Sequence, residues 1–154
     1  MKRTPKHGEV AIAWVGTRPL RTSIALAPCA AVERLPATVI DLIGAEIADA
    51  SFEILALLGF DQRGVLLFYE LMSQRGASSI TIDGPRILGL MATPSLREIL
   101  VAHNHPSGDP TPSRADRCFT ERLCDIARFC GITVIDHMVF AREKRASFVA
   151  LRLL

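Results

Sequence analysis

One stretch of the sequence decides both the fold and the chemistry, and it reads His103-Asn104-His105-Pro106-Ser107-Gly108-Asp109-Pro110-Thr111-Pro112-Ser113-Arg114-Ala115-Asp116. An apolar run typical of a buried strand leads into it, and a helical pattern with a serine N-cap leads out of it. Side chains alternate along a strand, so two histidines spaced i, i+2 project to the same face. Asp116 falls in the first turn of the following helix. We therefore expect the two imidazoles and this carboxylate to lie close together.

Such a ligand set suits zinc, because two imidazoles and one carboxylate leave a fourth position for water, as in catalytic sites. Zinc lowers the pKa of that water to about 7 and so supplies a hydroxide nucleophile. Each residue also has a structural interpretation: Ser113 and Asp116 have the spacing of a capping box, and a histidine at a strand end is often only a satisfied polar group. A cap does not require two histidines before it, so the combination predicts one zinc ion per chain, held by His103, His105 and Asp116.

The rest of the chain surrounds this unit with a pattern of strands and helices. We expect residues 1–35 to be a weakly specified N-terminal leader, and a single domain over 36–154. Hydrophobic spacing and turn residues predict helices at 36–50, 84–91 and 113–130, a hairpin of strands 52–60 and 65–72, further strands at 96–103, 132–140 and 146–153, a short strand at 79–82 and a charged turn at 142–145. Paired strands with interleaved helices predict an α/β sandwich built on a mixed sheet.

Composition excludes several classes of protein. The chain has 154 residues, of which 49% are hydrophobic and 22% charged, so it can bury a core and is not disordered. A net charge of +2 gives no electrostatic case for strong nucleic-acid binding. No apolar run approaches the length of a membrane span. The four cysteines form no C-x-x-C pair, and we expect reduced thiols in a cytoplasmic protein.

The stretch from His103 to Asp116 resembles the JAMM signature of the JAB/MPN metallopeptidase superfamily. The order of its residues resembles the RadC-like bacterial branch of that superfamily. Asp136-His137 and Ser147-Phe148 are similar to the end of RadC domains, and the resemblance covers 36–154. It implies the JAB/MPN fold, related to that of cytidine deaminase, with zinc on the three residues already singled out. It also implies that the Ser113 hydroxyl stabilises the oxyanion of a tetrahedral intermediate.

The same resemblance implies a glutamate on an earlier strand as general base. Glu53, Glu70 and Glu98 are the candidates, and Glu70 was expected to match the family position best. Glu98 has an odd offset from the histidine pair, and Glu53 opens the first strand, where the resemblance implies no such acid. Residues 71–77 depart from the aromatic-Gly-Thr pattern of RadC-like proteins, and no upstream helix-hairpin-helix region is recognised. His137 is either a group that supports the metal ligands or a polar residue on a half-buried strand, and we do not count it among the site residues.

The predicted function is a zinc-dependent metallohydrolase, a peptidase or isopeptidase acting on a peptide or protein substrate. The main alternative is a non-catalytic metal-binding accessory module associated with DNA repair or mobile elements. A zinc deaminase is disfavoured, because the chain has neither H-x-E at this position nor P-C-x-x-C. The letters His-Asn-His do not indicate an HNH nuclease, whose motif residues are spread over a longer segment.

Overall fold

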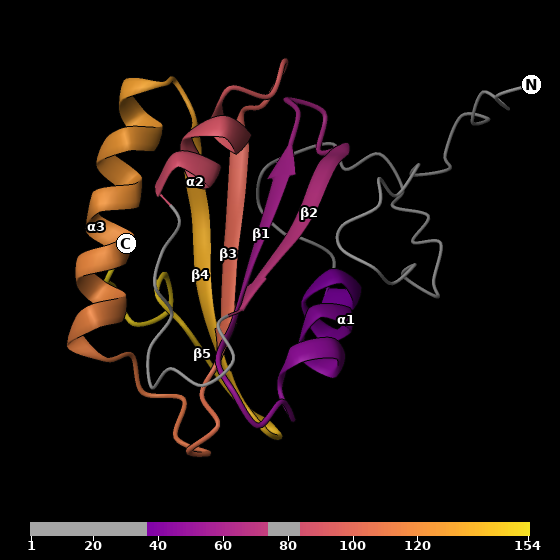
Figure 1. Ribbon diagram of the computed structural model, residues 1–154, viewed down its shortest axis with the longest axis vertical. Helices are drawn as coiled ribbons and strands as arrows, with labels where there is room; N and C mark the ends of the chain where they lie inside the picture. Colours follow the sequence, from indigo (N-terminus) through magenta and orange to yellow (C-terminus); the bar gives the residue numbers. More distant parts are fainter. Residues whose placement is uncertain (1–36, 74–83) are drawn as a thin grey trace, which may run out of the picture.

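The computed structural model describes residues 37–73 and 84–154, and these form a five-stranded mixed sheet covered by helices on both faces (Figure 1). The strand order is β2-β1-β3-β4-β5, and only β3 and β4 run parallel among these pairs. The elements in chain order are α1 (Ala37–Ile47), β1 (Ile54–Phe60), β2 (Leu66–Ser73), α2 (Gly84–Met91), β3 (Glu98–Asn104), α3 (Arg114–Phe129), β4 (Thr133–Ala141) and β5 (Lys144–Ser147).

This architecture confirms the predicted mixed α/β sandwich and its antiparallel hairpin. The expected leader at 1–35 and the expected short strand at 79–82 lie outside the described residues.

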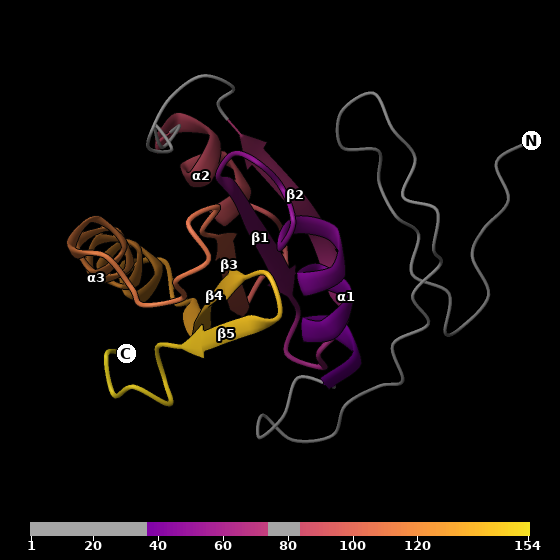
Figure 2. The same cartoon turned by 90° about the horizontal axis from the view of Figure 1, so that it is seen from below.

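Helices cover the two faces of the sheet unequally (Figure 2). Helix α1 places Val39, Ile43 and Ile47 on one stripe, at a spacing of four residues, and buries them against the face formed by residues such as Ala56 and Leu100. Helices α2 and α3 cover the opposite face, where their apolar residues pack on a second cluster that includes Leu55, Leu57 and Val101. The sheet therefore has an apolar layer on each side, which fixes the face to which each strand residue points.

The chain after β4 differs from the prediction. A last strand was expected over 146–153, but β5 ends at Ser147 and turns occupy 148–152. The Asp136 carboxylate is the cause: its Oδ2 accepts a hydrogen bond from the Ser147 hydroxyl at 2.6 Å, and its Oδ1 accepts one from the Val149 N–H at 3.1 Å. At Val149 the Asp136 side chain therefore takes the place of a backbone ladder bond, and the chain turns through 148–152. The strand also begins earlier than predicted, at Lys144, because Arg142 adopts a positive φ of 55° that tightens the turn.

Gly59 on β1 is a position where the packing requires a glycine. A Cβ atom there would lie 2.2 Å from Phe68 Cε1 and 2.7 Å from Leu96 Cδ1. We expect Gly59→Ala to lower the free energy of unfolding by about 1–3 kcal/mol, because the ring must leave its place over the strand. Urea unfolding measures this change.

The matched control for that substitution is Gly89→Ala on α2, where a Cβ atom would have no neighbour within 4 Å. Alanine in that helical position should stabilise the protein slightly. Equal urea midpoints for the two variants would contradict the role assigned to Gly59.

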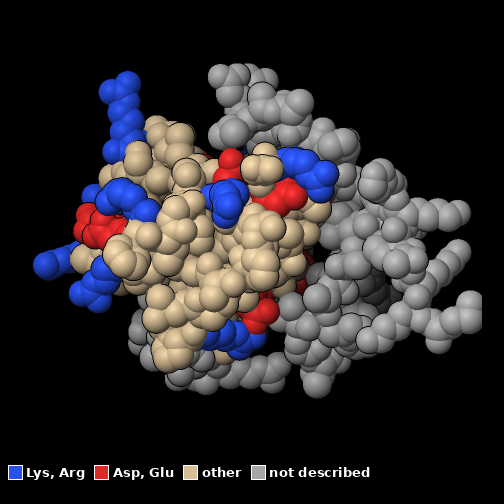
Figure 3. Space-filling model, turned by 90° about the horizontal axis from the view of Figure 1, so that it is seen from above, with Lys and Arg blue, Asp and Glu red and all other residues tan. Residues whose placement is uncertain are grey.

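Two surface properties bear on function. Among the described residues, no helix combines the length and the apolar character that crossing a bilayer requires. On the face seen in Figure 3, the described residues carry Lys and Arg interspersed with Asp and Glu and form no extended basic patch of the kind that binds nucleic acid.

Candidate metal centre

The predicted ligands meet at one end of the sheet, where β3 ends and α3 begins (Figure 1). His103 is on β3, His105 follows the strand, and Asp116 lies in the first turn of α3. The alternation of β3 turns both imidazoles to the face that α3 covers, and the intervening loop returns the chain to that same face. The strand-loop-helix unit therefore brings together the three side chains that the sequence spacing predicted to lie close to one another.

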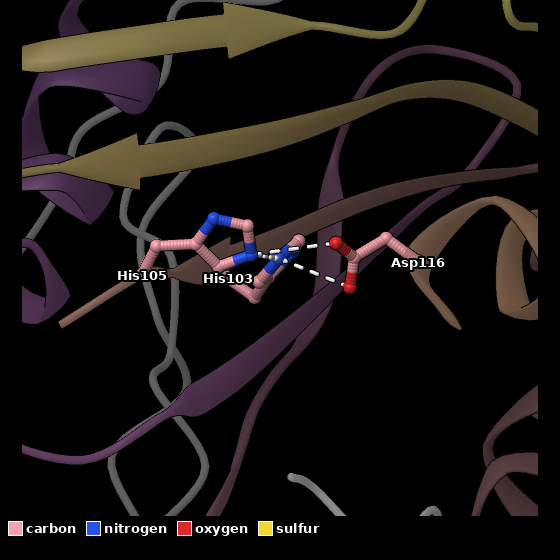
Figure 4. Close-up of side chains that lie close together, drawn as sticks. All are labelled: His103, His105 and Asp116. Carbon is pink, nitrogen blue, oxygen red and sulfur yellow. Dashed lines mark hydrogen bonds and ion pairs between the residues drawn. The ribbon is translucent and has the colours of Figure 1, made fainter. Parts of the chain in front are cut away.

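The ligand atoms point toward one another (Figure 4). His103 Nε2 lies 2.9 Å from His105 Nε2 and 3.3 Å from Asp116 Oδ1, and His105 Nε2 lies 3.3 Å from Asp116 Oδ2. Tetrahedral ligands about 2.0–2.1 Å from one ion are separated by roughly 3.3 Å. These three residues therefore fit a small divalent cation with one coordination position left open.

The orientation of His105 is fixed from behind by the loop. Its Nδ1 lies 2.8 Å from the carbonyl oxygen of Asp109. A carbonyl only accepts, so Nδ1 carries the hydrogen and the Nε2 lone pair faces the ligand cluster. Gly108, at φ 84°, closes this turn and donates its N–H to the His105 carbonyl at 3.1 Å. The positive φ explains why a glycine stands here.

Asp116 is held by the helix cap. The Ser113 hydroxyl oxygen accepts from the Asp116 N–H at 3.1 Å, and the Ser113 N–H donates to Asp116 Oδ2 at 2.6 Å, which completes the predicted capping box. Burial alone would raise the pKa of Asp116, but the neighbouring His103 imidazole and the hydrogen bonds from Ser113 hold that pKa well below its usual range. The cap and the ligand function therefore act together: the cap sets the carboxylate rotamer, and the carboxylate stays ionised.

Asn104 supports the site by joining two strands, and the sequence analysis did not single it out. Its side chain is fully buried on the face opposite the histidines, where Oδ1 accepts from the Ile54 N–H at 2.6 Å. Its Nδ2 donates to the carbonyls of Ala50 and Phe52 at 3.2 and 3.0 Å. This amide fastens the start of β1 to the end of β3. A polar residue inside an apolar strand, between two candidate ligands, was the available signal.

The structure places the three candidate glutamates very differently. Glu70 pairs across the sheet with Leu57, which in turn pairs with Val101, so Glu70 lies on the histidine face but two strands from β3. Its carboxylate forms an ion pair with Arg86 of α2. Glu98 begins β3, at the end of the strand remote from His103.

Glu53 immediately precedes β1, whose antiparallel register pairs Leu55 with His103. Continuing that register by two residues sets Glu53 opposite His105. Glu53 itself lies just outside β1, and an extended chain there would share the face of Leu55, which belongs to the apolar cluster beside the site. By register, Glu53 is therefore the candidate whose backbone lies nearest the two histidines.

His137 of β4 also belongs to this centre, although the sequence interpretation left it out. It is 1% exposed, and its Nε2 lies 2.8 Å from His103 Nδ1. Burial, and after it the neighbouring His103, lower the pKa of His137 to about 3, so the ring is neutral. The parallel pairing of Val101 with His137 brings it onto the histidine face.

Comparison with known proteins assigns the family. The model of the RadC-like JAB domain matches residues 34–153, and the chain therefore belongs to the RadC-like JAB domain family. The mixed sheet with its three helices is consistent with a JAB/MPN fold.

Several curated relatives of the chain carry the name UPF0758 protein. The chain is 31% identical over 113 residues to the UPF0758 protein STH371 of Symbiobacterium thermophilum, a match that covers 73% of this chain and 48% of the relative. It is 36% identical over 110 residues to UPF0758 proteins of Shewanella baltica and Shewanella frigidimarina, covering 70% of this chain and 48% of each relative. The chain thus spans about half the length of these relatives.

Proposed function

We propose that this protein is a zinc-dependent metallohydrolase that cleaves an amide bond in a peptide or protein substrate. The observation that carries the proposal is the ligand geometry: two imidazole nitrogens and a carboxylate at near-tetrahedral separations, with a position left open. A closed structural zinc site would have four protein ligands, whereas three are the mark of a site that acts on water. Membership of the JAB domain family supports the same function.

His103, His105 and Asp116 would hold the zinc. When bound there, it would supply a water of lowered pKa and polarise the scissile carbonyl. Ser113 is suited to the oxyanion role, because its oxygen accepts the Asp116 N–H and this bond leaves its own hydroxyl hydrogen to be donated. Ser113 also begins α3, so its hydroxyl lies beside the cluster that Asp116 joins.

A general base must take a proton from the attacking water and deliver it to the leaving amine. The register of β1 and β3 favours Glu53 for this role over Glu70, the residue expected from the sequence. Glu70 lies two strands away, and its carboxylate is paired with Arg86. The two residues make a matched pair for mutagenesis, because each change from Glu to Gln removes one carboxylate from the same face of the sheet.

Metal removal tests the proposed function against the accessory-module alternative. We expect a chelator to remove the zinc while the far-ultraviolet circular dichroism stays unchanged, because apolar clusters on both faces hold the sheet independently of the site. Hydrolysis of responsive substrates in a panel of peptides and isopeptides should be lost on removal and restored by zinc. Collapse of the fold together with the metal, and no hydrolysis when zinc is present, would favour the accessory module.

A further inference from the structure

A continuous line of hydrogen bonds runs behind the metal centre and connects two of its ligands. The Thr120 hydroxyl lies 2.7 Å from the carbonyl oxygen of Asp116, one turn earlier on α3, and 2.6 Å from Nδ1 of His137. The other nitrogen of that ring, Nε2, lies 2.8 Å from His103 Nδ1. The line therefore starts at the backbone of one ligand and ends at the imidazole of another.

The acceptors in this line determine where each hydrogen lies. The Asp116 carbonyl can only accept, so the Thr120 hydroxyl donates to it and must itself accept from His137 Nδ1. A His137 ring that carries its single hydrogen on Nδ1 has a lone pair on Nε2. That lone pair accepts from His103 Nδ1, and the Nε2 lone pair of His103 is left facing the ligand cluster.

The packing around His137 holds its ring in one orientation. Phe148 stacks on it, with centroids 4.5 Å apart and planes at 18°, while Phe119 meets it edge-on at 6.0 Å. Phe148 is itself fully buried, and Asp136 fixes the residues on either side of it by accepting from the Ser147 hydroxyl and the Val149 N–H. The turn that replaces the expected last strand therefore places the Phe148 ring against His137.

We propose that His137 and Thr120 are positioning residues that hold His103 in the tautomer with hydrogen on Nδ1, so that Nε2 is ready to bind the metal. The proposal rests on the proposed metal site and adds the part of the structure that prepares one of its ligands. A hydrogen bond from the outer nitrogen of a metal-binding histidine fixes the ring and raises its basicity, and loss of such a partner typically costs about 10- to 100-fold in metal affinity. In this chain the partner is a second histidine, fixed in turn by a helix threonine.

The matched pair Thr120→Val and Thr120→Ser tests the line without opening a cavity. Valine keeps the branched shape and removes the hydroxyl, whereas serine keeps the hydroxyl. Zinc dissociation constants are measured by chelator competition at pH 7 on folded protein. We expect Thr120→Val to weaken zinc binding by about 10-fold or more, with Thr120→Ser within about 3-fold of wild type.

Nitrogen-15 spectra of the imidazoles provide a readout that a purely structural role would not change. In the zinc-loaded wild type, His137 should carry its hydrogen on Nδ1, and Thr120→Val should populate the other tautomer. As a second variant, His137→Gln offers a carbonyl acceptor to His103 and should bind zinc more tightly than His137→Leu. Wild-type zinc affinity in Thr120→Val, or a wild-type His137 with hydrogen on Nε2, would overturn the inference. Failure of the wild type to bind zinc at all would instead overturn the proposed function.

Discussion

Replacing His103 and His105 together with alanine should reduce the zinc content from about one ion per chain to none. The double variant keeps only Asp116 of the described ligand cluster, and a single carboxylate cannot retain a zinc ion through dialysis. The fold should persist, since both apolar clusters are built from other residues. Elemental analysis after zinc loading gives the stoichiometry, and circular dichroism gives the fold.

Two single substitutions on α3 sharpen this experiment. Asp116→Asn should weaken zinc binding, because the amide lacks the charge of the carboxylate. Asp125→Asn is the matched control: this exposed carboxylate pairs with Arg128 and lies three turns along the helix from the cap, so zinc content should be unchanged. A wild type that stays metal-free after zinc is supplied, or a double variant that retains one ion, would refute the proposed metal centre.

Glu53→Gln should abolish most of the hydrolytic activity while leaving the zinc content at the wild-type level. General acid–base catalysis typically contributes about 10²- to 10⁴-fold, so the turnover of any responsive peptide or isopeptide should fall by at least the lower figure. The register supports this expectation, because Leu55 pairs with His103, and two more residues in the same register would bring Glu53 opposite His105. Turnover and zinc content are measured on the same preparation.

Glu70→Gln is the matched control for that experiment. This substitution removes the buried carboxylate that forms an ion pair with Arg86 of α2. We expect it to lower the melting temperature, because the ion pair between β2 and α2 is lost, and to cause little loss of turnover. If the two results are exchanged, with turnover lost in Glu70→Gln and kept in Glu53→Gln, then Glu70 is the base that the sequence alone had suggested.

Local sequence determined much of this protein. The i, i+2 histidines, the capping box of Ser113 with Asp116 and the turn at Gly108 all act within 14 residues, where alternation, helix geometry and backbone φ fix the outcome. The same local signals predicted the first hairpin, whose turn is closed by Asp61 accepting from the N–H groups of Arg63 and Val65. The fold class and the clustering of two histidines with a carboxylate could therefore be predicted without coordinates.

Tertiary pairing decided what the sequence left open. The proposal of Glu53 as the base depends on the pairing of Leu55 with His103, and Asn104 ties these two strands together across 50 residues of chain. The contact of His103 with His137 spans 34 residues and arises only because β3 and β4 run parallel. The early end of β5 follows from a carboxylate 11 residues upstream. Each of these contacts depends on how distant segments pair and pack, and no pattern within a single segment specifies that pairing.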